Sequence, residues 1–163
     1  MDTNEAQSLR AMAEAADAGL TGLDARTWLE RLEGSMSELR SGLEWLLEHD
    51  RPGALRMATD LAGFWRLSGR IPEGRAWLDQ ASAAADPEDA TMPRALYENA
   101  LLAFWQGHDA VSRSLLERSL EIARRSCDRA TWIAPNSCVK RPWSGCAEPM
   151  TSSGGRTQFT CWA

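Results

Sequence analysis

Lysine is almost missing from this chain of 163 residues: seventeen of its eighteen basic residues are arginine, and Lys140 is the only lysine. A phosphate-binding loop of the form GxxxxGK[ST] needs a lysine followed by Ser or Thr, and Arg141 follows Lys140. Long apolar runs are missing too, whereas a helix that spans a bilayer needs about 20 apolar residues. The sequence therefore excludes a P-loop nucleotide site and predicts no membrane partner.

Cysteine is absent before Cys127 and leucine is absent after Leu120, so the composition changes near residue 126. The four cysteines form no CxxC pair and have no histidine near them, so we expect no metal site and no cofactor. Residues 126–163 are rich in Ser, Thr, Pro and Gly, which is typical of a disordered or irregular tail. One hypothesis is that this tail is translated out of frame, and a natural disordered tail is the alternative.

Charge and the first residues indicate where the protein acts. The chain has 23 acidic against 18 basic residues, a net charge of −5. Because affinity for nucleic acid comes largely from Lys and Arg contacts to phosphate, we expect no direct nucleic-acid partner. Residues 1–10 are polar and lack the basic segment followed by an apolar segment that is typical of an export signal, so we expect a cytoplasmic protein.

From Asn4 to Arg125 the apolar residues recur every three or four positions, and no stretch alternates with period two. This spacing predicts an all-α fold built from antiparallel helix hairpins joined by short loops. Asp24, Thr91 and Asp109 are expected to cap helices, and Gly69 is expected to end one. The expected helices of the main region cover residues 24–50, 52–69, 73–85, 92–106 and 109–125.

An internal repeat lies within these helices. Shifting the sequence by 38 residues superimposes Gly69 on Gly107, Arg75 on Arg113 and Leu78 on Leu116. The two units resemble tetratricopeptide repeats, helical hairpins of about 34 residues with small and large side chains at fixed positions. We therefore expect a short stack of hairpins, an α-solenoid, in residues 24–125, preceded by a helix and loop in residues 1–23 and followed by the tail in residues 126–163.

A more specific resemblance covers roughly residues 11–125. Its motifs are Trp28-Leu29-Glu30-Arg31-Leu32-Glu33, Phe64-Trp65 and Gly74-Arg75-Ala76-Trp77-Leu78. They look like the repeat region of bacterial LuxR-type transcriptional regulators and NB-ARC-like signalling ATPases. The resemblance implies a fragment of such a regulator, without the ATPase or DNA-binding domain, whose repeats sense or dock a partner in signal transduction.

No catalytic residue is predicted. The pairs His49-Asp50 and His108-Asp109 fall at expected helix ends, where histidine complements the helix dipole and aspartate caps the next helix. The serines have no nucleophile-elbow motif around them. We therefore expect no enzyme activity.

The candidate binding surface follows from the resemblance to repeat proteins. In such a stack the inner face of each first helix lines a concave groove that holds a protein or peptide. Arginine and aromatic residues, which dominate binding hot spots, occur on that face. The alternative is a solvated face with one exposed aromatic side chain. The expected groove residues are Arg56, Thr59, Gly63, Arg66, Arg94, Tyr97, Leu101 and Trp105.

The predicted function is a non-catalytic protein-interaction module, and an acidic or amphipathic peptide would suit its groove. The alternative is a regulatory segment that acts in trans on an intact ATPase-linked transcription factor. A stack normally needs about three repeats or a cap for stability. An uncapped end therefore predicts self-association or marginal stability.

Overall fold

The computed structural model describes the backbone of residues 2–133 and the side chains of residues 2–127. Within this range every regular element is an α-helix, as the apolar spacing predicts. The predicted tail beyond Ile133, with Cys138, Cys146 and Cys161, lies outside the described residues. The helices are α1 (Thr3–Gly19), α2 (Ala25–Gly34), α3 (Met36–His49), α4 (Arg51–Asp60), α5 (Ala62–Leu67), α6 (Ile71–Ala84), α7 (Met92–Trp105) and α8 (Asp109–Ile133).

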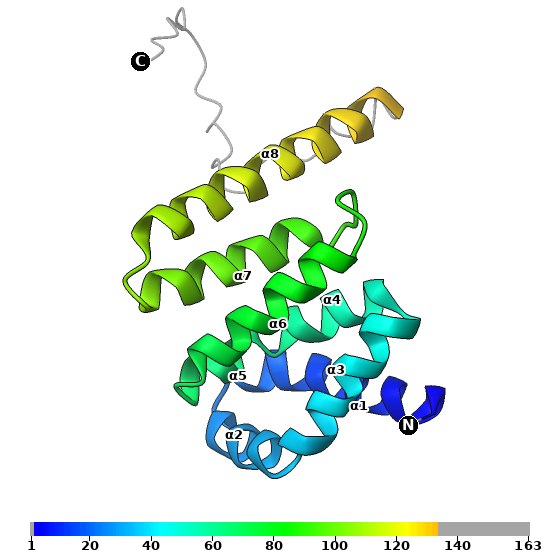
Figure 1. The fold of residues 1–163 in the computed structure, drawn as a ribbon, viewed down its shortest axis with the longest axis vertical. Coiled ribbons are helices and arrows are strands. Elements are labelled where there is room, and N and C mark those ends of the chain that lie inside the picture. Colours follow the sequence, from blue (N-terminus) through cyan, green and yellow to red (C-terminus); the bar gives the residue numbers. More distant parts are fainter. Residues whose placement is uncertain (1, 134–163) are drawn as a thin grey trace, which may run out of the picture.

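The helices stack as hairpins from one end of the molecule to the other (Figure 1). Helix α1 packs on α3, the bent pair α4–α5 packs on α6, and α7 packs on α8. Each hairpin also contacts the next one, because α1 and α3 touch α4 while α4 and α6 touch α7. Residues 1–23 thus contribute α1 to the same packed body, although their sequence lies before the repeats.

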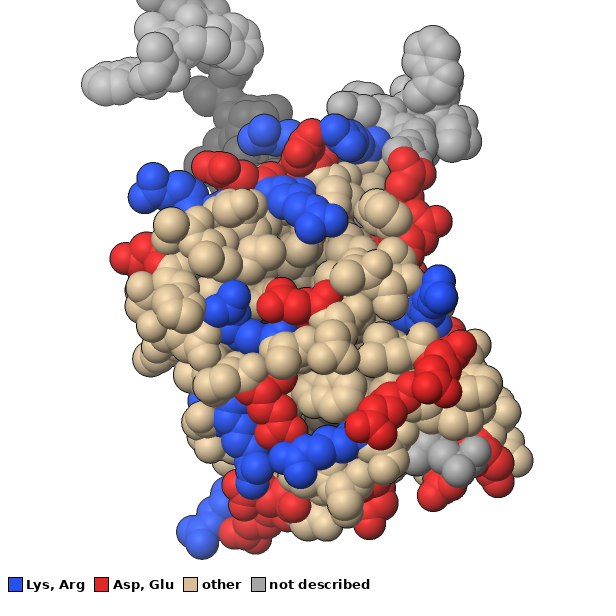
Figure 2. Space-filling view, in the orientation of Figure 1, with Lys and Arg blue, Asp and Glu red and all other residues tan. Residues whose placement is uncertain are grey.

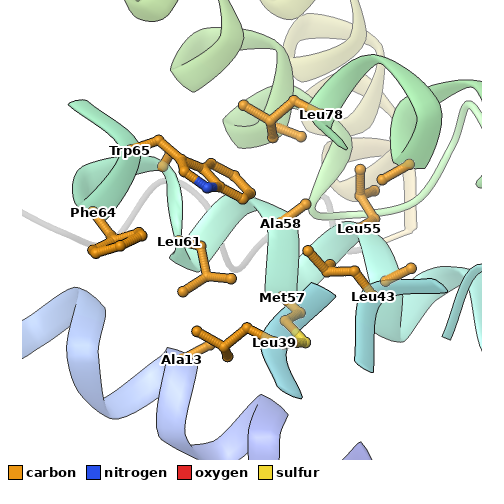
Figure 3. Close-up of a cluster of buried hydrophobic side chains, with 14 of the residues drawn as sticks. Ala13, Leu39, Leu43, Leu55, Met57, Ala58, Leu61, Phe64, Trp65 and Leu78 are labelled. Atoms are coloured by element: carbon orange, nitrogen blue, oxygen red, sulfur yellow. The ribbon is translucent and has the colours of Figure 1, made fainter. Parts of the chain in front are cut away.

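The core is continuous through the first two hairpins (Figure 3). Trp65 and Phe64 are its largest fully buried side chains, and Leu78 of α6 and Leu39 of α3 are buried in the same cluster. Burying one side chain of this size stabilises the fold by roughly 1.5–3 kcal/mol. On α1 the buried residues are small, which lets that helix approach closely: Ala6, Ala13 and Ala16.

Two expected helices are interrupted, so their predicted lengths are wrong. The helix expected over residues 24–50 ends at Gly34, and α3 begins after Ser35. Glycine and serine favour helices weakly, and the Ser35 N–H donates to the Leu32 carbonyl at 3.2 Å, in a tighter turn than that of an α-helix. The helix expected over residues 52–69 bends at Leu61, between α4 and α5.

The bend at Leu61 keeps its backbone hydrogen bonds. The Leu61 N–H donates to the Met57 carbonyl and the Trp65 N–H to the Leu61 carbonyl, each at 3.1 Å. Two residues earlier, the Thr59 hydroxyl donates to the Leu55 carbonyl at 2.7 Å. A hydroxyl bonded to the carbonyl four residues back often bends a helix, which explains why apolar spacing alone missed this feature.

Some of the residues predicted at helix ends adopt the expected conformation or bond, and others do not. Gly69 and Gly107 have φ values of 73° and 76°, the left-handed conformation that ends a helix. The Asp50 carboxylate accepts from the Gly53 N–H at 3.0 Å and caps α4. Asp24 and Thr91 stand at the positions before α2 and α7, as predicted, but neither side chain makes the expected capping hydrogen bond.

Helix α8 is longer than its sequence pattern indicates. It continues to Ile133 and passes residue 126, where the composition changes. Residues 126–133, which were assigned to an irregular tail, are therefore helical. In the part of the chain that the structure describes, no helix is both long enough and apolar enough to cross a bilayer.

Candidate functional site

A charged pocket opens where α1, α4 and the start of α7 meet. Its volume is about 550 Å³. Two of the predicted groove residues, Arg56 and Arg94, line it. The other charged lining residues come from α1 and from the end of α4: Arg10, Glu14, Asp17 and Asp60.

Arg94 joins three helices at this pocket. Its guanidinium donates to the Asp17 carboxylate of α1 at 2.5 Å and to the Asp60 carboxylate of α4 at 3.0 Å. Burial lowers the pKa of Arg94. The hydrogen bond and charge of Asp17, together with the charge of Asp60, outweigh this effect, so the pKa is raised above its ordinary value. Arg94 therefore stays charged and holds the rear of the pocket together.

Two of the carboxylates near Arg94, those of Asp60 and Glu98, have raised pKa values. Burial raises the pKa of Asp60 above its ordinary value, and the charge of Arg94 opposes this only in part. One turn along α7, burial likewise raises the pKa of Glu98, whose carboxylate lies 4.0 Å from the Arg66 guanidinium.

Two charges in the pocket remain available. Arg56 and Glu14 make no ion pair with any residue that the structure describes. The Arg10 guanidinium lies 3.5 Å from the Asp50 carboxylate, which also caps α4. Three arginines and three carboxylates line the pocket, so its formal charges cancel. Such a lining suits a ligand with charges of both signs better than a polyanion.

The remaining predicted groove residues do not line this pocket. Thr59 is buried and bonded to its own helix, so the prediction that it is exposed is wrong. Arg66 is half-buried and faces Glu98. Tyr97 and Trp105 are exposed on α7, with half-buried Leu101 between them at helical spacing. The predicted set is thus divided between the pocket and a separate stripe along α7.

Sequence reasoning also misplaced Phe104 and missed the contribution of α1. In the helix expected over residues 92–106, the apolar spacing of Leu96, Ala100, Ala103 and Phe104 predicts one inward stripe. Phe104 is exposed, so its part of that prediction is wrong. The residues that α1 brings to the pocket were missed because the segment was treated as lying outside the stack. A signal was present: Ala6, Ala13 and Ala16 recur at helical spacing, which predicts a face for close packing against another helix.

A second polar cluster joins α6 to the last hairpin. The Arg75 guanidinium donates to the Asn99 amide oxygen at 3.3 Å, to the Gln106 amide oxygen at 2.8 Å and to His108 Nδ1 at 2.9 Å. The Asn99 amide in turn donates to the Asp79 carboxylate at 2.6 Å. Because Asn99 is buried, these bonds satisfy polar groups that water does not reach.

Three members of the two His-Asp pairs, His49, Asp50 and His108, have structural partners. His49 Nδ1 donates to the Trp45 carbonyl at 2.8 Å, and its ring stacks on the Trp45 indole at a centroid distance of 4.4 Å. Asp50 caps α4, and His108 accepts from Arg75. Each histidine is thus occupied by packing or by the Arg75 cluster.

The charge pattern of the visible surface fits the mixed pocket. Figure 2 shows acidic and basic side chains intermingled, with no broad basic area on the face in view. Among residues 2–127, no group of three or more His, Cys, Asp or Glu side chains is placed to hold a metal ion.

Comparison of the sequence with family models, with curated proteins and with solved structures gives no match.

Proposed function

We propose that this chain is a non-catalytic protein-interaction module that holds a peptide in the pocket between α1, α4 and α7. The observation that carries the proposal is the pairing pattern of the pocket. Arg94 is fixed by Asp17 and Asp60, while Arg56 and Glu14 have no partner among the described residues. A fixed wall with one available cation and one available carboxylate can orient an extended peptide that carries both charges.

The resemblance to the repeat region of LuxR-type regulators and NB-ARC-like ATPases supports the same proposal. In those proteins the repeats are taken to dock a partner and restrain the ATPase. A peptide from such a regulator, bound in trans, is the partner that this resemblance favours. A cytoplasmic location fits this role.

A binding screen with the full chain tests the proposal. The probe is an array of synthetic peptides that differ in the order and spacing of acidic and basic residues. We expect peptides with both charges to bind. We expect Arg56→Glu to lower their affinity at least about tenfold, because it turns an attractive contact with the acidic residue of the peptide into a repulsive one.

The matched control is Arg51→Glu, which makes the same charge change on the same helix outside the pocket lining. Binding that survives Arg56→Glu and Glu14→Lys, or that Arg51→Glu weakens equally, would place the peptide elsewhere. A complete lack of peptide binding would overturn the proposal.

A further inference from the structure

The end of the stack formed by α7 and α8 carries large apolar side chains in solvent. Phe104 of α7 is 60% exposed, and Leu120 of α8 is 56% exposed. Phe104 and Leu116 line one shallow hollow of about 320 Å³. Tyr97 lies two helical turns before Phe104 on the same side of α7. We call Tyr97, Phe104, Leu116 and Leu120 the open face.

The internal repeat indicates what shape of partner covers such a face. With the shift of 38 residues, Tyr97 matches Thr59 and Leu116 matches Leu78. Thr59 is 1% exposed and Leu78 is 0% exposed in a stack where α7 packs on both α4 and α6. Tyr97 is 46% exposed, and Leu116 is only half-buried. The open face therefore repeats a surface that a helix pair covers elsewhere in the same molecule.

A charged residue of α8 shows the same lack of a partner. Arg113 matches Arg75, which donates to Asn99 and Gln106 of the following hairpin. Arg113 is exposed and makes no ion pair or side-chain hydrogen bond with any described residue. Its guanidinium is thus free to meet a neighbouring helix pair.

The charges along α8 are complementary to those of a second copy of this chain. Asp109 and Arg124 lie at equal distances along the helix from the midpoint between Leu116 and Glu117. They are about 22 Å apart, and about 60° apart around the helix axis. Both are exposed, and neither has an ion-pair partner among the described residues. Two antiparallel α8 helices that cross at this midpoint bring Asp109 of each copy opposite Arg124 of the other.

We propose that the protein forms a two-fold symmetric dimer, in which the open face of one copy packs against the open face of the other. Leu116 and Leu120 occupy the centre, and the two Asp109–Arg124 pairs lie at the ends. A two-fold axis makes one surface complementary to itself, and this is the commonest symmetry of soluble oligomers. The surface is distinct from the peptide pocket, so either proposal can fail without the other.

Sedimentation velocity of the full chain over a wide range of concentration tests the dimer. We expect a reversible monomer–dimer equilibrium. Leu120→Arg is expected to raise the dissociation constant at least about tenfold, because the two-fold axis brings position 120 opposite Arg113 of the other copy, where a second positive charge is repelled. Leu67→Arg is the matched control, since Leu67 is also exposed but lies on α5. Circular dichroism checks that each variant keeps its helices.

Charge reversal tests the antiparallel arrangement. Asp109→Arg and Arg124→Asp are each expected to weaken the dimer, and the double variant is expected to restore it, since each pair then regains opposite charges. A chain that stays monomeric at all concentrations overturns the proposal and leaves the open face to another protein. A dimer that Leu120→Arg does not weaken, or that the double reversal does not restore, overturns it as well.

Discussion

The side chain of Trp65 rests against the backbone of Gly74. A Cβ atom added at Gly74 would lie 2.7 Å from three side-chain atoms of Trp65, the Cβ, Cδ2 and Cε3. Trp65 is 1% exposed, so its ring is enclosed and has little room to move away. The distance between α5 and α6 is therefore set by the absence of a side chain at one position.

Gly74→Ala should destabilise the protein by about 1–3 kcal/mol, because the added methyl group overpacks the contact with Trp65. Gly34→Ala is the matched control, since a Cβ there meets nothing within 4 Å and alanine favours a helix more than glycine does. Urea denaturation followed by circular dichroism measures both. Equal effects of the two substitutions would contradict the close approach.

Leu78→Ala should lower the free energy of unfolding by about 2–5 kcal/mol, since it leaves a cavity in the core of the stack. Leu67→Ala removes the same atoms from an exposed position and should change stability by less than about 0.5 kcal/mol. Thermal and chemical denaturation of the two variants give the comparison. A small effect at Leu78 would mean that the core is packed differently.

Arg75→Ala should destabilise the protein by about 1–3 kcal/mol, because it removes a hydrogen-bond partner from the buried Asn99 amide. Arg113→Ala, at the equivalent place in the next hairpin, should have an effect within about 0.5 kcal/mol when measured at low protein concentration. The contrast separates the role of Arg75 from the general loss of one positive charge. A similar effect of the two variants would show that the Arg75 cluster contributes little.

Two carboxylates should give opposite pH dependences. The hydrogen bond from Arg40, at 2.6 Å, lowers the pKa of Glu73 below its ordinary value of 4.5. The stabilisation by Glu73 is therefore complete above pH 4.5 and is lost as the pH falls through the lowered pKa. Against Glu73→Gln, the wild type should lose its advantage in melting temperature as the pH falls below that value.

Glu98 is the counterpart, because burial raises its pKa above the same ordinary value of 4.5. The protonated form favours folding, so its contribution is present below pH 4.5 and is lost as the pH rises through the raised pKa. Against Glu98→Gln, the wild type should become relatively less stable as the pH rises through this range. Parallel pH profiles for the two variants would contradict the assigned environments.

Local patterns predicted the fold class well. Apolar spacing indicated the helices, and Gly69, Gly107 and Asp50 marked their ends, since each of these features depends on residues within one or two turns. The bend at Leu61 escaped prediction because it accompanies a hydroxyl bond made by Thr59. The side of α7 that carries Phe104 was misassigned because apolar residues surround most of that helix, and only tertiary packing decides which of them are buried.

The pocket could be predicted only in part. Arg56 and Arg94 were expected on a binding face, and the structure brings them together. Asp17 was not expected there, because it lies 77 residues from Arg94 and no local pattern connects the two. Ion-pair partners of this kind depend on how whole helices stack, and a single sequence shows this only indirectly.

The length of α8 has a consequence for how the molecule opens. The Ser119 hydroxyl donates to the carbonyl of Pro93, in the first turn of α7, so α7 begins beside this point of α8 and the later part of α8 extends past it. Beyond half-buried Ile122, the side chains up to Cys127 are exposed. Residues 123–126 thus bury little side-chain surface against the stack, and a segment with few tertiary contacts opens at small free energies. Amide hydrogen exchange should therefore be slow around Ser112 and should quicken steadily toward Arg125, so that α8 unravels from one end long before the stack unfolds.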